Sequence, residues 1–188
     1  MAEGNPAEQR LLGRVPYEHG VSFCYYSSRG RVARILQKAK YKSMPWLDRQ
    51  MALLFVRELR RASSPWPYDI DCIVPIPVHW HRQVLRGYNQ CAAIAEALSK
   101  EWHLPIEADC LIKVHSRDSK VGKTFLSRIT SWNRCFIVRH PERLQGRHLL
   151  LVDDVMTTGS TLDEACQAIR QAVPQCRISF LTLGMART

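Results

Sequence analysis

Two adjacent carboxylates and a cluster of hydroxyl side chains stand close together in the C-terminal third of the chain. Asp153 and Asp154 follow the apolar residues 149–152, and the sequence Thr-Thr-Gly-Ser-Thr occupies residues 157–161. That segment offers four hydroxyl groups and five backbone N–H groups. Apolar residues then recur at helical spacing over 162–173, so the segment would lie at a helix N-terminus, where the helix dipole favours an anion. These features predict a cradle for a phosphate group.

The two carboxylates restrict what else the ligand can contain. Asp153 and Asp154 would repel a phosphate unless they contact sugar hydroxyls or a hydrated Mg²⁺ ion, which prefers oxygen ligands. A ligand with a 5′-phosphate, a ribose and a metal-bound diphosphate satisfies every group here. We also expect a positive φ at Gly159, and a capping box between Thr161 and Glu164 that starts the helix. The alternative interpretation is a turn after a buried strand, with two solvated aspartates.

The hydrophobic pattern predicts the elements that position these groups. Residues 149–152 lack polar alternation, which is typical of a strand buried on both faces in a parallel sheet. Ligands of such sheets bind beyond the carboxyl ends of the strands, where the acidic pair emerges. We therefore predict an α/β fold, a parallel β-sheet with helices on both faces. Further strands are expected at 23–26, 70–74, 110–112, 136–138 and 177–183, and helices at 31–39, 47–61, 92–102 and 162–173.

The length of 188 residues suits one domain. We predict a single domain over residues 1–188, with an N-terminal extension at 1–67 and a ligand-binding core at 68–188. Residues 1–20 are rich in glycine and proline, and they are expected to form a loop or a loosely docked arm.

Two motifs carry a resemblance to a known family. Residues 149–161 resemble the phosphoribosyl-pyrophosphate (PRPP) motif of type I phosphoribosyltransferases: four hydrophobic residues, two acids, a spacer and then Thr-Gly-x-Thr. Residues 74–82, Val-Pro-Ile-Pro-Val-His-Trp-His-Arg, and 86–90, Arg-Gly-Tyr-Asn-Gln, resemble the ComF family, a branch of these proteins linked to DNA competence. In that family a four-cysteine zinc module usually precedes such a chain, so the resemblance implies a natural short form or a trimmed one.

The resemblance implies Mg²⁺-dependent transfer of a phosphoribosyl group from PRPP to a nitrogen acceptor. Asp153 and Asp154 would hold ribose hydroxyls or metal-bound water, and Arg86 would contact the diphosphate as a catalytic residue. The implied 5′-phosphate loop consists of Val155, Met156, Thr157, Thr158, Gly159, Ser160 and Thr161, and the implied diphosphate loop of Val74, Pro75, Ile76 and Pro77 with Asn89 and Gln90. Asn89 is also a plausible N-cap for the following helix.

A cationic, aperiodic segment follows residue 112. The resemblance implies a mobile loop that closes over PRPP, with cations at Lys113, Arg117, Lys120, Lys123 and Arg128. Residues 122–124, Gly-Lys-Thr, do not complete a nucleoside triphosphate loop, because Arg117 stands where that motif needs glycine. The family's usual Thr, Gln and Asn are replaced by Arg117, Lys120 and Ser131, which leaves catalytic turnover open.

Composition leaves two function classes open. The net charge of +10 suits both a PRPP site and a polyanion, so the alternative is a non-catalytic competence or DNA-uptake accessory protein that binds PRPP or single-stranded DNA. A DNA-processing protein and a homodimer also remain open as partners.

The cysteines and histidines predict no metal site. The seven cysteines contain no C-x-x-C pair, so neither a zinc site nor a disulfide framework is predicted. His79 and His81 are expected to be ordinary surface residues. The absence of a secretion signal and of a membrane-spanning run predicts a cytoplasmic protein.

Overall fold

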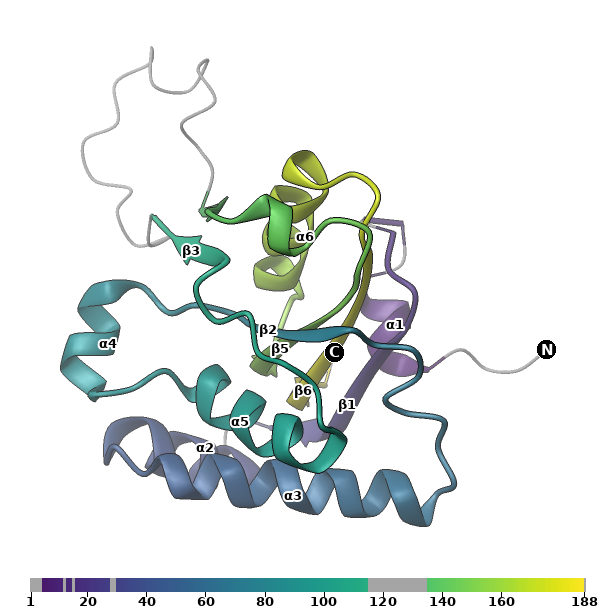
Figure 1. Cartoon of the computed structure of the whole chain (residues 1–188). Helices are drawn as coiled ribbons and strands as arrows, with labels where there is room; N and C mark the ends of the chain where they lie inside the picture. The colour runs from purple at the N-terminus through teal and green to yellow at the C-terminus, as the bar shows by residue number, and fades with distance from the viewer. Residues whose placement is uncertain (1–4, 12, 15, 28–29, 115–134, 188) are drawn as a thin grey trace.

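A four-stranded parallel sheet forms the centre of the computed structural model, which describes residues 5–11, 13–14, 16–27, 30–114 and 135–187. Each neighbouring pair of strands in this sheet is parallel. The strand that carries the acidic pair lies inside the sheet rather than at its edge (Figure 1). In sheet order, the strands are β1 (Gly20–Tyr26), β6 (Arg177–Ala186), β5 (His148–Met156) and β2 (Cys72–Pro75).

Helices cover both faces of this sheet, in agreement with the prediction (Figure 1). The α/β fold predicted from the sequence is therefore confirmed. None of the helices in the described residues is long and apolar enough to cross a membrane. One face carries α1 (Pro6–Leu11) and α6 (Ser160–Ala172), and the other carries α2 (Arg31–Tyr41), α3 (Pro45–Arg61) and α5 (Gln90–Trp102).

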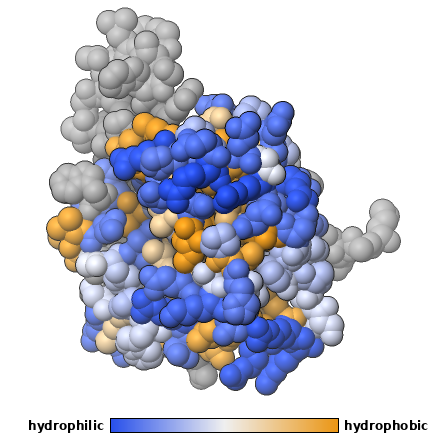
Figure 2. Space-filling view, viewed as in Figure 1, coloured by the Kyte–Doolittle hydropathy of each residue, from blue (hydrophilic) through white to orange (hydrophobic). Residues whose placement is uncertain are grey.

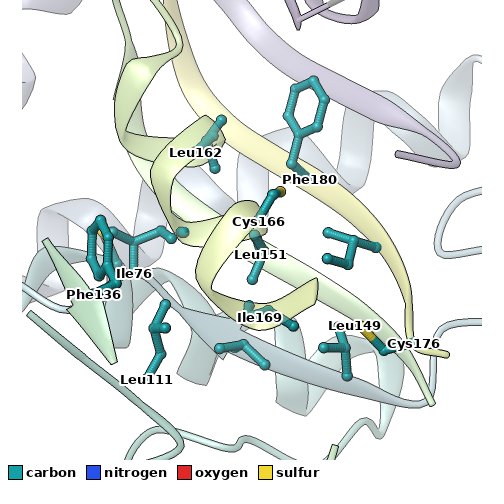
Figure 3. Packing of buried hydrophobic residues seen from close by; sticks show 14 of the residues in the cluster. Ile76, Leu111, Phe136, Leu149, Leu151, Leu162, Cys166, Ile169, Cys176 and Phe180 are labelled. Carbon is teal, nitrogen blue, oxygen red and sulfur yellow. The ribbon is translucent and has the colours of Figure 1, made fainter. Parts of the chain in front are cut away.

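The side chains of β5 alternate between the two cores. Leu149 and Leu151 pack under α6 (Figure 3), whereas Leu150 and Val152 belong to the cluster on the α5 side. All four are 0% exposed. Full burial of each such side chain contributes about 1.5–3 kcal/mol, so this strand is held in place from both faces. The position of the acidic pair at its end is correspondingly well defined.

Two short strands differ from the expected arrangement. β3 (Leu111–Lys113) and β4 (Phe136–Val138) pair antiparallel with each other and form a separate two-stranded sheet. The prediction that they extend the parallel sheet is wrong. Runs of three apolar residues do not specify a partner strand, and here Phe136 packs into the core cluster on the α6 side instead.

A further helix, α4 (Trp80–Arg86), lies in the segment that the sequence analysis treats as irregular. Its Val84 and Leu85 are 74% and 84% exposed. Figure 2 shows hydrophobic surface, in orange, on the side of the molecule where α4 lies. Because the apolar side chains that the structure describes in this helix are exposed, the hydrophobic pattern cannot reveal it. A 3₁₀ turn, η2 (Pro141–Arg143), precedes β5.

The described part of residues 1–20 is docked on the sheet rather than loosely attached. Ala7 and Leu11 of α1 are 1% and 2% exposed and belong to the core beneath α6. The Asn5 side-chain amide donates a hydrogen bond to the carbonyl of Gly20 at 2.6 Å. The expectation of a loose arm is therefore wrong, because two apolar side chains of this segment complete the core.

Candidate functional site

The predicted phosphate cradle lies between the end of β5 and the start of α6. β5 ends at Met156 and α6 begins at Ser160, so three residues connect them. Gly159 has a φ of 81°, in the left-handed region, as predicted from the sequence. Thr157 and Thr158 are exposed, so their polar groups are accessible to a ligand.

The start of α6 differs from the predicted capping box. Gly159 occupies the N-cap position, and the side-chain oxygen of Thr158 accepts a hydrogen bond from the N–H of Ser160, the first residue of α6, at 3.4 Å. The predicted box between Thr161 and Glu164 is wrong, because the left-handed Gly159 starts the helix before Thr161. The hydroxyls of Thr158 and Ser160 lie 2.9 Å apart at this helix end. A helix N-terminus with hydroxyl groups beside it is well suited to an anion.

Val155 and Met156 contribute their backbone rather than their side chains to the predicted 5′-phosphate loop. Met156 is 2% exposed in the core under α6, and the half-buried Val155 packs on the opposite cluster. The two side chains thus anchor the end of β5 on both faces, immediately before the exposed threonines.

The two aspartates occupy different environments. Asp153 is 8% exposed, and its Oδ1 accepts hydrogen bonds from the backbone N–H of Asp154 at 2.9 Å and from the thiol of Cys91 at 3.5 Å. Asp154 is half-buried, and its Oδ1 accepts from the backbone N–H of Val155 at 2.8 Å. Asp154 is consequently the more accessible carboxylate of the pair.

Cys91 acts as a hydrogen-bond donor in this site. Burial, together with the charges of Asp153 and Asp154, raises the pKa of its thiol well above the ordinary value. The thiol is therefore protonated at neutral pH and donates to the Asp153 carboxylate. A raised pKa makes Cys91 a poor nucleophile.

The predicted diphosphate loop runs beside the acidic strand end. Pro75 is paired with Val152 in the sheet, and the N–H of Ile76 donates to the carbonyl of Val152 at 2.9 Å. The Asn89 side-chain amide donates to the carbonyl of Ile76 at 3.2 Å, while its oxygen accepts from the N–H of Cys91 at 3.0 Å. The prediction of Asn89 as an N-cap is confirmed.

These contacts bring the two sequence motifs together. Val74, Pro75 and Ile76 are buried, Pro77 is half-buried and Gln90 is buried at the first turn of α5. Asn89 links this loop to Cys91, and Cys91 in turn contacts Asp153. The diphosphate loop, the start of α5 and the acidic pair thus form one continuous edge of the sheet.

Tyr88 anchors this edge to the helices on the α5 side, and the sequence analysis did not single it out. Its hydroxyl lies 2.7 Å from a carboxylate oxygen of Asp48 and 2.9 Å from the carbonyl oxygen of Ala39. Asp48 is 1% exposed, on α3. The sequence offers one signal for this contact, an aspartate inside an amphipathic helix. It cannot identify Tyr88 as the partner, because Tyr88 is 40 residues away from Asp48.

Most of the predicted cationic residues lie outside the part that the structure describes. Arg117, Lys120, Lys123 and Arg128 fall between the described residues 114 and 135. Arg86 is the last residue of α4, before the left-handed Gly87, but its side chain is also outside the described part. The Lys113 ammonium lies 5.1 Å from the centroid of the Phe136 ring. Closure of a cationic loop over PRPP therefore stays a prediction.

The donor set at the strand end fits a hard cation. Two carboxylates at the carboxyl end of β5, one of them half-buried, supply oxygens of the kind that Mg²⁺ prefers. Within the described ranges, a group of three potential ligands occurs elsewhere, at Glu107, Asp109 and Cys110. There Arg143 forms ion pairs with Glu107 and, at 2.9 Å, with Asp109, so guanidinium groups neutralise that cluster.

Comparison with known proteins agrees with this geometry. The family profile described as "Phosphoribosyl transferase domain" matches residues 89–185. The chain is 29% identical to "Competence protein F" of Haemophilus influenzae, over 73% of this chain and 61% of that protein. It is 32% identical to "Competence protein ComFC" of Bacillus subtilis, over 64% of this chain and 47% of that protein. It is 30% identical to "DNA utilization protein YhgH" of Escherichia coli, over 87% of this chain and 71% of that protein.

A solved structure shares the fold. The glutamine PRPP amidotransferase from B. subtilis, complexed with ADP and GMP, aligns with a TM-score of 0.50 at 16% identity, over 77% of this chain and 30% of that chain. The fold and these matches define a type I phosphoribosyltransferase-like protein. Within that class, the chain belongs to the ComF family.

Proposed function

We propose that this protein binds PRPP with Mg²⁺ and transfers its phosphoribosyl group to a nitrogen acceptor. The observation that carries the proposal is the junction of β5 and α6. There a left-handed Gly159 separates an acidic strand end from the N-terminus of α6, and the exposed Thr157 and Thr158 stand beside it. Groups suited to the phosphate, the ribose and the diphosphate of PRPP all lie at this edge of the sheet.

Each part of the site has a distinct task in this proposal. The backbone N–H groups and hydroxyls of residues 157–161 bind the 5′-phosphate. Asp154 accepts hydrogen bonds from the ribose hydroxyls, and the loop at residues 74–77 lies along the diphosphate. Mg²⁺, held by Asp153 and Asp154 directly or through water, would neutralise the diphosphate charge.

Transfer breaks the bond between the anomeric carbon and the diphosphate, which leaves with the bonding electron pair. A new bond then joins that carbon to the acceptor nitrogen, which loses a proton to water. Positive charge develops on the ribose as the first bond breaks, and the carboxylates of β5 favour that charge because they lie at a partly desolvated strand end.

The test of this proposal is a calorimetric titration with PRPP, with and without Mg²⁺, followed by a diphosphate-release assay with nucleobases and ammonia as acceptors. We expect saturable binding that strengthens with Mg²⁺, and release of diphosphate with at least one nitrogen acceptor. Binding of PRPP without release of diphosphate would indicate a PRPP sensor rather than an enzyme. No binding of PRPP would contradict the proposal. A cytoplasmic location and a homodimer stay predictions from the sequence.

A second candidate function is binding of single-stranded DNA, and one surface feature favours it. A groove of about 460 Å³ between α2 and α3 has Trp46 at its rim, 56% exposed, with the exposed cations Arg34 and Lys38 beside it. Aromatic rings that stack on bases and cations that contact phosphates are the usual elements of such sites. None of the residues that line the groove belongs to the strand end or the loops that would bind PRPP.

Replacing Trp46 with alanine separates the two candidates. If the groove binds single-stranded DNA, Trp46→Ala should weaken oligonucleotide binding about tenfold or more, because one stacked base contributes ~1–3 kcal/mol. Leu54→Ala, at a 43% exposed position of the same helix, is the matched control and should leave DNA affinity unchanged. Fluorescence anisotropy over a salt series should also show log affinity falling by about 0.7 per phosphate contact for each unit of log salt. A weak affinity that Trp46→Ala does not alter would rule the groove out.

A further inference from the structure

The N-terminal segment, the described part of residues 5–17, contacts the phosphate cradle through two arginines. One guanidinium nitrogen of Arg10 donates a hydrogen bond to the carbonyl of Thr157, and the other donates to the carbonyl of Ala186 at 2.7 Å. Arg14 donates to the carbonyl of Thr158 at 2.7 Å. These arginines therefore hold two consecutive peptide carbonyls of the cradle from residues more than 140 positions earlier in the sequence.

These bonds determine where the cradle's N–H groups point. In a trans peptide unit, the C=O of one residue and the N–H of the next point in opposite directions. A carbonyl of Thr157 that is held towards Arg10 directs the N–H of Thr158 away from α1. The bond from Arg14 to Thr158 directs the N–H of Gly159 in the same way. Both donors then face away from the N-terminal segment.

Leu11 completes this support between the two arginines. A Cβ atom added to Gly159 would lie 2.4 Å from Cδ2 of Leu11, so the segment and the cradle are in close contact. Leu11 is 2% exposed and belongs to the core beneath α6. The cradle thus rests on a packed side chain rather than on solvent.

The segment is itself anchored on both sides of these contacts. Before Arg10, a carboxylate oxygen of Glu8 accepts from the N–H of Gly20 at 3.0 Å. After Arg14, the guanidinium of Arg170 donates to the carbonyl of Pro16 at 2.7 Å. Because the N-terminal segment is held on both sides, its contacts with the cradle have a defined position.

We propose that Arg10 and Arg14 are positioning residues, which orient the N–H groups of Thr158 and Gly159 towards the 5′-phosphate. The inference rests on the proposed function, because it assigns the supporting residues of the same cradle. It also gives the N-terminal segment a role in ligand binding that its sequence does not suggest. Neither arginine contacts the ligand in this proposal.

The test compares Arg10→Gln, Arg14→Gln and the double variant with the parent protein. We expect ribose 5-phosphate and PRPP to bind at least tenfold more weakly to the double variant. Magnesium diphosphate, which lacks a 5′-phosphate, should bind within twofold of the parent. Arg10→Lys keeps the charge but has one donor nitrogen where arginine uses two, so it should recover part of the affinity. Arg60→Gln removes the same charge from α3, where Arg60 pairs with Glu101 at 3.0 Å, and should change nothing.

Order parameters of the backbone amides in the unliganded protein provide an answer that does not depend on PRPP. The order parameters of Thr158 and Gly159 should fall in the double variant, while those of residues 149–152 stay at the parent values. Parent-like order parameters at these two residues would overturn the inference. So would an equal loss of ribose 5-phosphate and magnesium diphosphate binding, or the same loss in Arg60→Gln. If the parent binds no ligand, the proposed function fails, and the order parameters still decide whether the arginines order the cradle.

Discussion

Gly159→Val is expected to abolish PRPP binding at ligand concentrations that saturate the parent protein. Gly159 has a φ of 81°, which a β-branched residue rarely adopts, and a non-glycine residue held there costs about 1–3 kcal/mol. Its new Cβ would also lie 2.4 Å from Cδ2 of Leu11, so either this buried side chain or the cradle has to shift. A loss of about 100-fold or more in affinity, or ~2.7 kcal/mol, should follow in a calorimetric titration.

A second glycine provides the control for strain alone. Gly146 has a similar φ of 71°, but a Cβ added there meets no atom within 4 Å. Gly146→Val should therefore lower the thermal midpoint somewhat without changing PRPP affinity. If Gly159→Val bound PRPP as the parent does, the cradle assignment would be wrong, since both the backbone strain and the contact with Leu11 act on residues of the cradle.

Asp153→Asn and Asp154→Asn are expected to impair the site unequally. Asp154 is the half-buried carboxylate, so its substitution should weaken Mg²⁺-dependent PRPP binding or turnover by about 10- to 100-fold with little change in stability. Asp153 is 8% exposed and accepts from the Cys91 thiol and the Asp154 N–H. Hydrogen bonds to a charged group contribute about 1.5–3 kcal/mol each, so Asp153→Asn should lower both the affinity and the thermal midpoint without unfolding the protein.

Titrations with PRPP over a range of Mg²⁺ concentrations, paired with thermal melts, measure both effects. Asp109→Asn is a suitable control, because it removes an exposed carboxylate that pairs with Arg143 away from the strand end. It should leave PRPP binding unchanged. If both strand-end variants bound PRPP with the parent's affinity and Mg²⁺ dependence, the carboxylates would be ordinary turn residues and the phosphoribosyl interpretation would fail.

Local rules of chain geometry explain what the sequence by itself determined. The apolar run 149–152 has no polar alternation, which is typical of a strand buried on both faces, and the structure has such a strand there. Gly159 stands where the chain turns sharply from strand to helix, and glycine is the residue that tolerates the left-handed conformation found there. Asn89 precedes an apolar helical pattern and caps it through the N–H of Cys91. Each of these features depends on residues within a few positions of one another.

Only the tertiary structure decided which distant residues meet. The start of α6 depends on how the loop leaves β5, so Gly159 rather than Thr161 holds the N-cap position. The unequal burial of Asp153 and Asp154 depends on Cys91, which α5 brings to the strand end. Arg10 and Arg14 reach the cradle because Leu11 completes a core formed by residues much later in the chain. Hydrophobic burial is non-directional, so the pattern shows that such side chains are buried but not which neighbours they meet.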